Sequence, residues 1–419
     1  MKLFKRIAIM LVTVSVALSA VSCASSSKAM ADHFNGASSS TDSDSVVQRP
    51  AGLLTACAWN DNDQYDKWTE LFMQGKTENG KFVEYIGKNS WGFNSLQRIK
   101  VTVNGGEENL PAAGVEVVCK DTEGKTCFAA VTDANGVAYL FTELKEGTVA
   151  VTAGESTVEE NFSANTRELA LHLDRTEEKP NRIELMFVVD VTGSMGDELD
   201  YLKNEIADVV GRVVTANDGV QISLALLFYR DHSDKETFRY YDFTNVNDPV
   251  GLQTQQEAID VQSATGGGDW PEAVDEALQM AVEKQWGSDA STKIIFQVLD
   301  APPHSGAQYQ ITYHGAVMTA AKKGIRICPV ICSGADVELE YLVRQAAIYT
   351  AGTFVYLTDD SGIGNEHYDP GLENVTVEAL NSLMVRLING YHSGTFADPV
   401  DWRQELGETK ETEETEPTE

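Results

Sequence analysis

Three short polar segments follow predicted strands or lie between a strand and the next helix. The first, Asp190-Val191-Thr192-Gly193-Ser194, follows the apolar run 183–189. The second, Gly266-Gly267-Gly268-Asp269, precedes a predicted helix, and the third is Asp300, which ends the apolar run 294–299. Carboxylate and hydroxyl oxygens are the ligands that hard divalent cations such as Mg²⁺ prefer. If one fold brings these segments together, they predict a divalent-cation site.

The region 181–395 contains the elements that would position these segments. Continuous apolar runs, typical of buried parallel strands, occur at 183–189, 220–228, 294–299, 325–331 and 354–357. Apolar residues at three- and four-residue spacing predict helices at 195–213, 273–282, 316–323, 339–347 and 377–388, and 238–243 reads as an extra edge strand. Alternating strands and helices predict a doubly wound, mostly parallel α/β sheet. Ligands bind such sheets at the carboxyl ends of the strands, where the three segments fall.

The polar segments resemble the metal-ion-dependent adhesion site of the von Willebrand factor A family. That family has a first loop Asp-x-Ser-x-Ser, a second loop with a Thr and a third loop with an Asp. The matching positions here are Asp190, Thr192, Ser194, Asp269 and Asp300, with Asp269 in the place of the second-loop Thr. The resemblance covers about half of the chain. It implies a Rossmann-like fold, a bound divalent ion (Mg²⁺ first, Mn²⁺ or Ca²⁺ as alternatives) and a role in binding.

Asp269 is the difference from the family pattern that should affect metal binding most. A Gly-Gly-Gly-Asp loop followed by Pro271-Glu272 resembles a subgroup of the family that also carries Asp-Val-Thr-Gly-Ser-Met, as residues 190–195 do. Three carboxylates around one divalent ion exceed its charge. We therefore expect Asp269 to tighten metal binding and to weaken the ion's demand for an acidic partner.

Two side motifs should lie on the same face as the metal site. Tyr229-Arg230-Asp231-His232 follows the second strand, and Ala301-Pro302-Pro303-His304 follows Asp300. Both resemble segments of the same subgroup. Arg230, Asp231, His232 and His304 are therefore candidates for contact with a partner, because loops around such sites supply specificity. The alternative is structural, with Arg230 paired to an acid and His304 hydrogen-bonded within the loops.

Residues 97–174 change to a period of two, and turn signals separate the short runs. This pattern predicts a small β-sandwich. The stretch 131–139, Val-Thr-Asp-Ala-Asn-Gly-Val-Ala-Tyr, resembles the carboxypeptidase regulatory-like, or transthyretin-like, fold, which implies a spacer domain. Cys119 and Cys127 flank a predicted hairpin turn, and a disulfide between them and a pair of free thiols are both open.

The segment 51–96 is rich in aromatic residues, including Trp59, Trp68 and Trp91, so we expect it to pack onto a neighbouring domain. Its run of acids, Asp61-Asn62-Asp63-Gln64-Tyr65-Asp66, lacks the turn glycine and closing Glu of a calcium loop. A helix start with capping acids is the preferred interpretation.

The first 23 residues resemble a bacterial lipoprotein signal. A basic start is followed by the apolar run 7–18 and by Ala20-Val21-Ser22-Cys23, although the family prefers Leu where Ala20 stands. The resemblance implies a lipid on Cys23 and an extracytoplasmic place on the bacterial membrane or outer surface. Residues 24–50 predict a flexible tether, and the acidic segment 403–419 predicts a disordered tail.

The net charge of the chain limits the classes of partner that it can bind. The chain has 32 Lys and Arg against 64 Asp and Glu, a net charge of −32, which argues against nucleic acid. The preferred function is metal-dependent binding of a protein or cell-surface ligand, not catalysis. One alternative is a metal-dependent hydrolase, which needs a base such as His232 or His304 beside the ion. The other is a metal-free structural scaffold.

Overall fold

The structure is a computed structural model that describes residues 51–73, 80–154, 156–174, 181–268, 270–287 and 292–407. Cys23, the expected tether 24–50, Asp269 and the end of the acidic tail lie outside these ranges. The described residues belong to one compact unit, 48–419. Among them, no helix combines the length and the apolar character that a membrane span needs.

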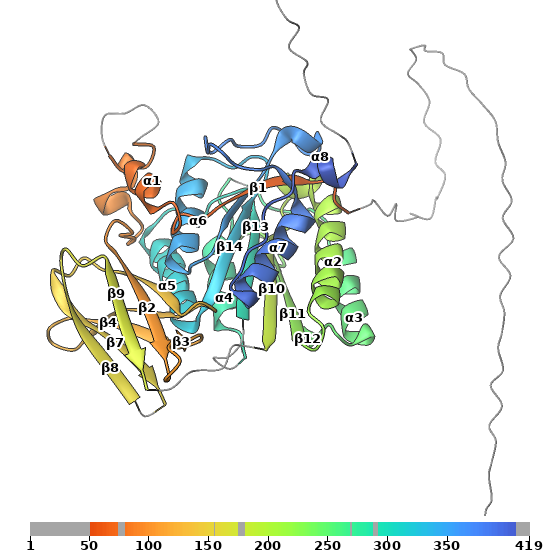
Figure 1. The fold of residues 1–419 in the computed structure, drawn as a ribbon. Helices are drawn as coiled ribbons and strands as arrows, with labels where there is room; N and C mark the ends of the chain where they lie inside the picture. Colours follow the sequence, from red (N-terminus) through yellow and green to blue (C-terminus); the bar gives the residue numbers. More distant parts are fainter. Residues whose placement is uncertain are drawn as a thin grey trace, which may run out of the picture. The chain divides into compact units, whose positions relative to one another are not determined.

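An eight-stranded sheet forms the centre of this unit, in the order β12-β11-β10-β13-β14-β15-β1-β16 (Figure 1). The strands are β1 (Thr55–Trp59), β10 (Arg182–Asp190), β11 (Gln221–Tyr229), β12 (Phe238–Asn245), β13 (Thr292–Leu299), β14 (Ile325–Ile331), β15 (Phe354–Leu357) and β16 (Glu378–Ala379). β11, β10, β13, β14 and β15 run parallel, whereas β12, β1 and β16 are antiparallel to their neighbours. The predicted mostly parallel α/β sheet is confirmed.

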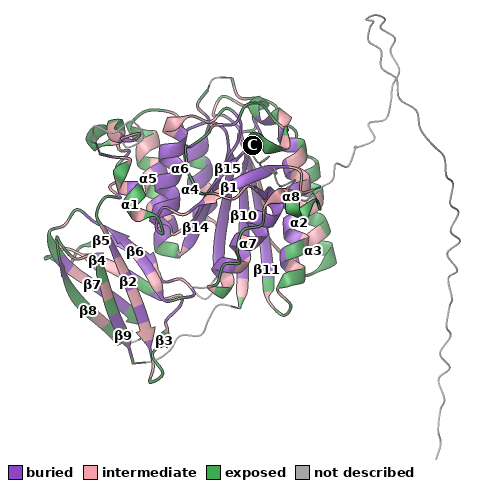
Figure 2. Cartoon of the chain, turned by 45° about the horizontal axis from the view of Figure 1, so that its top comes forward, coloured by how far each residue is buried: buried purple, intermediate pink, exposed green. Residues whose placement is uncertain are grey.

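Helices cover both faces of this sheet, since successive residues of a buried strand point to opposite sides. In β10, Leu185, Phe187 and Val189 pack in one core with α2 (Leu199–Ala216), α3 (Pro249–Asp260) and α7 (Leu380–Ser393). Met186 and Val188 pack in the other core with α4 (Val274–Glu283), α5 (Ala307–Lys323) and α6 (Val337–Tyr349). Figure 2 shows the strands buried between these layers.

The ends of three helices differ from the sequence prediction. A 3₁₀ turn, Gly193–Asp197, precedes α2 and turns the chain away from β10. Helix α5 begins at Ala307, nine residues before the predicted 316, because its first turns are polar and carry little apolar periodicity. Helix α7 begins only at Leu380, because Glu378 and Ala379 pair with β1.

The all-β region forms two four-stranded sheets, β3-β2-β6 with β9 beside β2, and β5-β4-β7-β8. The strands are β2 (Arg98–Gly105), β3 (Leu110–Pro111), β4 (Glu116–Lys120), β5 (Thr126–Val131), β6 (Val137–Phe141), β7 (Glu146–Ala153), β8 (Ser156–Ser163) and β9 (Glu168–Leu173). Pairing is antiparallel except between β2 and β9. The predicted small all-β region is confirmed.

The hairpin between β4 and β5 carries Cys119 and Cys127. Cys119 pairs with Phe128, and the register then shifts so that Lys120 faces Thr126. This bulge leaves Cys127 without an opposite residue, and its side chain is exposed while Cys119 is buried. Both thiols are free in the structure.

The aromatic segment 51–96 joins two parts of the unit. Its strand β1 lies in the large sheet, and its helix α1 (Tyr65–Glu70) carries the fully buried Trp68. The Phe82 ring lies 5.7 Å from that of Trp68 and 5.4 Å from that of Tyr341 in α6, all edge to face. Aromatic pairs of this geometry add to the apolar burial that holds a segment in place.

Candidate functional site

The polar segments that follow β10 and β13 lie at neighbouring positions of one sheet edge. Asp190 is the last residue of β10, and Val189 pairs with Val298 two residues before Asp300. Because β10 and β13 are parallel neighbours, both acids emerge at the carboxyl end of the sheet. Their side chains are almost fully buried. The sequence-predicted Asp190 and Asp300 are thus brought together.

The first loop is ordered by its own hydrogen bonds. Oδ1 of Asp190 accepts from the backbone N–H of Thr192 at 2.8 Å and from the Thr192 hydroxyl at 2.7 Å. The Thr192 and Ser194 hydroxyl oxygens are 3.1 Å apart. Because the Thr192 hydroxyl donates to Asp190, Ser194 donates its single proton to Thr192. Ser194 also lies close enough to Asp300 to lower the pKa of that acid. Four of the five predicted positions therefore form one continuous polar chain.

Several carboxylate oxygens at this edge are buried and have no hydrogen-bond partner among the described residues, including Asp190 Oδ2, Asp300 Oδ1 and Glu272 Oε2. Burial, followed by repulsion from Asp300, raises the pKa of Asp190 to about 7. Burial raises the pKa of Asp300 to about 6, although the nearby Ser194 lowers it. Burying a charged carboxylate without a partner costs folding free energy, and a bound cation would offset that cost.

Glu272 is the acid to which the sequence analysis gave no role. Its backbone N–H donates to Pro302 O at 3.0 Å, which holds it beside the loop that follows Asp300. Burial, then repulsion from Asp190 and three further acids, raises its pKa to about 9. The only sequence signal was its place directly after the glycine-rich loop, and that place does not say which way the side chain points.

The second loop lies against the first and requires its glycines. Gly193 N–H donates to Gly266 O at 3.2 Å. Gly267 has φ +76°, and a Cβ there would lie 2.9 Å from Glu272 Oε1 and 3.3 Å from the Cβ of Thr192. A Cβ on Gly266 would lie only 2.4 Å from Asp234 Oδ1. The glycines thus permit close packing of the loop against acids, a role separate from phosphate binding.

Arg230 holds this second loop in place. Its guanidinium donates to the carbonyl oxygen of Thr265 at 2.7 Å and to that of Ser263 at 3.3 Å. A third hydrogen bond, 3.4 Å long, reaches the carbonyl of Glu236. Arg230 is buried, so its described contacts are those of a positioning residue within the loops. Its expected partner, an acid, is replaced by three backbone carbonyls.

The two histidines of the side motifs lie beside the acids and are engaged with other groups. His304 Nε2 is 2.6 Å from Asp231 Oδ1. Although burial alone would raise it, hydrogen bonds from His304 and Ser233 hold the pKa of Asp231 at about 2. The rings of His232, His304 and Tyr309 lie 5.2–5.6 Å from one another. His232 is within 3.6 Å of Glu276.

The donor set at the edge consists of carboxylates and hydroxyls. Within the described ranges, no group of three or more His, Cys, Asp or Glu side chains has the spacing of a metal site. The described residues that point to one place are therefore Asp190 and Asp300 with the hydroxyls of Thr192 and Ser194. Asp269 lies outside the described residues, so the fifth position is not tested. The unpartnered acid oxygens nevertheless suit a hard divalent cation.

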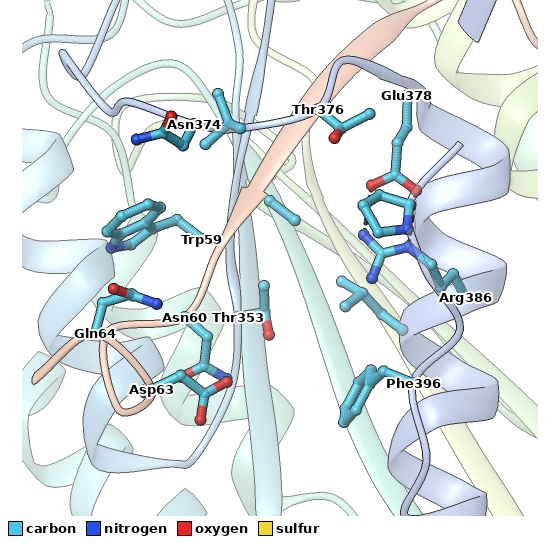
Figure 3. Close-up of a pocket in the computed structure, with 14 residues that line it drawn as sticks. Trp59, Asn60, Asp63, Gln64, Thr353, Asn374, Thr376, Glu378, Arg386 and Phe396 are labelled. Atoms are coloured by element: carbon cyan, nitrogen blue, oxygen red, sulfur yellow. Dashed lines mark hydrogen bonds and ion pairs between the residues drawn. The ribbon is translucent and has the colours of Figure 1, made fainter. Parts of the chain in front are cut away.

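A separate cavity of about 350 Å³ lies in front of β1 (Figure 3). Trp59, Asn374 and Phe396 are among the side chains around it, and Glu378 there accepts a 2.7 Å hydrogen bond from Arg386. Trp59 ends β1 and pairs with Phe354, the first residue of β15. The cavity therefore lies toward the amino-terminal ends of the parallel strands, away from Asp190.

This fold and the acids at its carboxyl edge agree with the match to known families. Residues 184–349 match the family model of the von Willebrand factor A domain, so this part of the chain is such a domain, preceded by an all-β region.

Among solved structures, the chain is similar to the conserved hypothetical protein BatB from Bacteroides thetaiotaomicron, with 15% identity and a TM-score of 0.32 over 50% of this chain and 98% of BatB. It is also similar to the pilus adhesin SpaC from Lactobacillus rhamnosus GG in its open conformation, with 11% identity and a TM-score of 0.37 over 69% of this chain. The chain spans 35% of SpaC. No curated protein matches it.

Proposed function

We propose that the von Willebrand factor A domain binds a divalent cation through Asp190, Thr192, Ser194 and Asp300, with Asp269 as a further ligand, and that this site docks a partner. The observation that carries the proposal is the pair of buried, unpartnered oxygens at the ends of adjacent strands, Asp190 Oδ2 and Asp300 Oδ1. Burial raises the pKa of both acids, and repulsion between like charges adds to the rise for Asp190, so a cation between them would relieve both the burial cost and the repulsion.

The proposed cation is Mg²⁺, since all the donors are oxygens, and Mn²⁺ or Ca²⁺ fit the same donor set. A bound ion with an open coordination position supplies a Lewis-acidic contact for an oxygen atom of the partner. The chain's own residues fix that contact: the Thr192 and Ser194 hydroxyls are aligned by Asp190, and Arg230 holds the adjacent loop. With Asp269 as a third carboxylate, the site favours a partner that offers a neutral oxygen over one that offers an acid.

Binding, not hydrolysis, is the function that we propose for this site. A hydrolase needs a base positioned beside a metal-activated water. His304 Nε2 lies 2.6 Å from Asp231, whereas His232 lies 3.6 Å from Glu276 and its buried Nε2 has no hydrogen-bond partner among the described residues. Neither imidazole makes a described contact with Asp190 or Asp300. The partner is a protein or a cell-surface ligand.

Calorimetry on the purified chain tests the metal step. Wild type should bind Mg²⁺ or Mn²⁺ saturably, and the ion should raise the unfolding temperature. Asp190→Ala should abolish both effects, while Asp218→Asn, at an exposed acid in the turn after α2, should leave them unchanged. Equal binding by wild type and Asp190→Ala would refute the site. Partner capture from intact cells, with and without chelator, then tests docking.

We also propose that Cys23 carries a lipid that anchors the chain outside the cytoplasm. The support is the signal-like sequence that ends in Ala20-Val21-Ser22-Cys23. Cells fed an alkyne fatty acid should label the full-length chain, and Cys23→Ala should lose the label and release the protein from membranes. Unchanged labelling of Cys23→Ala would contradict the anchor.

A further inference from the structure

A cavity of about 610 Å³ lies where the all-β region meets the amino-terminal edge of the large sheet. On one side it is lined by the β4 and β7 strand ends, including Glu116 and Thr152, and on the other by residues from α4, β13 and α5. Four of its lining residues are lysines: Lys284, Lys293, Lys322 and Lys323. Glu116 is the one acid among the described residues that line it.

This concentration of positive charge runs against the composition of the chain. Acids outnumber Lys and Arg by 64 to 32 overall, whereas four lysines and one acid are among the described residues that line the cavity. A cavity wall of one sign focuses the electrostatic potential and raises the local concentration of counter-ions. Small anions are therefore the ligands that the cavity favours.

Lysines at helix ends have an ordinary structural role, which accounts for part of this cluster. Lys323 Nζ donates to Val282 O, the carbonyl near the end of α4, at 2.7 Å, and Lys284 Nζ lies 3.9 Å from the centre of the Tyr240 ring. Cations stabilise helix carboxyl ends in this way. Lys293 belongs to strand β13 and is only 4% exposed, and it too has a structural contact, because its Nζ donates to Lys323 O at 3.1 Å.

The lysine contacts also fix the geometry of the cluster. The bond from Lys293 to Lys323 O and the bond from Lys323 to Val282 O tie the strand and both helix ends together. An ammonium has three N–H donors, so the bond from Lys323 to Val282 O leaves two of them available. The exposed Lys322 stands beside it at the end of α5. A tetrahedral oxyanion could accept from several of these ammoniums at once.

We infer that this cavity is a binding site for a small anion that carries phosphate or sulfate groups. It is independent of the proposed metal site, because Lys293 and Asp300 stand at opposite ends of β13, separated by roughly 23 Å of strand. The volume suits a small anion, and the net charge of the chain opposes a long polyanion such as nucleic acid.

The test is calorimetric titration of metal-free full-length protein at low ionic strength with inorganic phosphate, pyrophosphate, sulfate and acetate. Wild type should bind phosphate, pyrophosphate or sulfate saturably, more weakly as salt rises, and should bind acetate at least about tenfold more weakly. The arm that binds tightest distinguishes a phosphate ligand from a sulfate ligand. No saturable binding to any of the three, or acetate binding of equal strength, overturns the inference.

Variants locate the site within the chain. Lys284→Gln with Lys322→Gln removes two charges and should weaken the binding at least about tenfold. The matched control is Lys145→Gln. This exposed lysine directly precedes the first residue of β7, whereas the cavity lies at the last residues of that strand. Far-ultraviolet circular dichroism checks the fold, and if the double variant is unfolded, Lys322→Gln alone at its exposed position should still weaken binding. Unchanged affinity in the folded variant, or an equal loss in Lys145→Gln, overturns the assignment.

Discussion

Arg344 and Asp61 form a buried ion pair that joins helix α6 to the loop after β1. Arg344 Nε donates to Asp61 Oδ2 at 2.9 Å, and a second guanidinium nitrogen donates to the other carboxylate oxygen. The two residues are 283 positions apart in the chain. Glu340 accepts a third bond from the same guanidinium at 2.7 Å. Asp61, which the sequence predicted to lie at a helix start, therefore links the amino-terminal segment to helix α6.

Removing the carboxylate of this pair should destabilise the fold strongly. Asp61→Ala leaves the buried guanidinium with Glu340 alone, and breaking a buried pair in this way costs about 3–5 kcal/mol of unfolding free energy. Urea denaturation measures the loss. Asp66→Ala, at an exposed acid on α1, should change stability by less than about 0.5 kcal/mol. A loss below about 1 kcal/mol for Asp61→Ala would contradict the assignment.

His367 makes stability depend on pH. Its Nε2 lies 2.8 Å from Glu198 Oε1 and its Nδ1 lies 2.7 Å from Asp359 Oδ1. Burial alone would lower its pKa, but the two carboxylates raise it above 6.5. Because the folded pKa is the higher one, the stabilisation is complete below pH 6.5 and is lost as pH rises through the folded value.

The His367→Gln variant tests this dependence. It should lose about 2 kcal/mol at pH 5.5, where the imidazolium pair is intact, and less at pH 8.5. Urea midpoints at the two pH values give the difference, with His172→Gln, at an exposed histidine of β9, as the control. A loss that is the same at both pH values would show that the ring packs there without carrying charge.

Gly267 should affect metal binding by the nearby acids as well as the conformation of its own turn. In Gly267→Ala, the new Cβ would crowd Glu272 and Thr192 at a φ of +76°. Gly219 has a similar φ of +77° but open space around the Cβ position, so Gly219→Ala isolates the backbone strain. We expect both to lose about 1 kcal/mol of stability and only Gly267→Ala to weaken Mg²⁺ binding. Equal metal affinity in the two variants would contradict close packing of the second loop.

Asp269→Thr restores the residue that the family resemblance implies in the second loop. Removing one of three carboxylates should weaken Mg²⁺ binding about tenfold or more, because the ion loses a charged ligand. Titration calorimetry compares the variant with wild type and with Asp218→Asn. Unchanged or tighter binding would mean that Asp269 does not reach the ion.

Much of the large sheet could be predicted from the sequence because its strands are buried on both faces. The runs 325–331 and 354–357 coincide with β14 and β15. Helix α3 was missed because it is glutamine-rich and buries few apolar residues, Ala258 and Ile259 among them. The place of β1 in the sheet was also missed, since its pairing with β15 joins residues about 300 positions apart, and no local pattern encodes that partner.

Part of the candidate site could also be predicted from the sequence. Asp190 and Asp300 follow apolar runs directly, so their place at the carboxyl edge follows from the topology. Glu272 could not be assigned, because its direction depends on the contact of its backbone with Pro302. The bulge that separates Cys119 from Cys127 likewise depends on cross-strand register, which the turn sequence alone did not fix.

The central claim is that Asp190 and Asp300 share one divalent ion. Anomalous scattering from crystals grown with Mn²⁺ tests it most directly, because the ion's position is then observed. We expect a peak within about 2.6 Å of an oxygen of each acid, with Ser194 and Thr192 beside it. A Mn²⁺-soaked crystal with no peak at this edge, or with an ion bound only elsewhere, would contradict it.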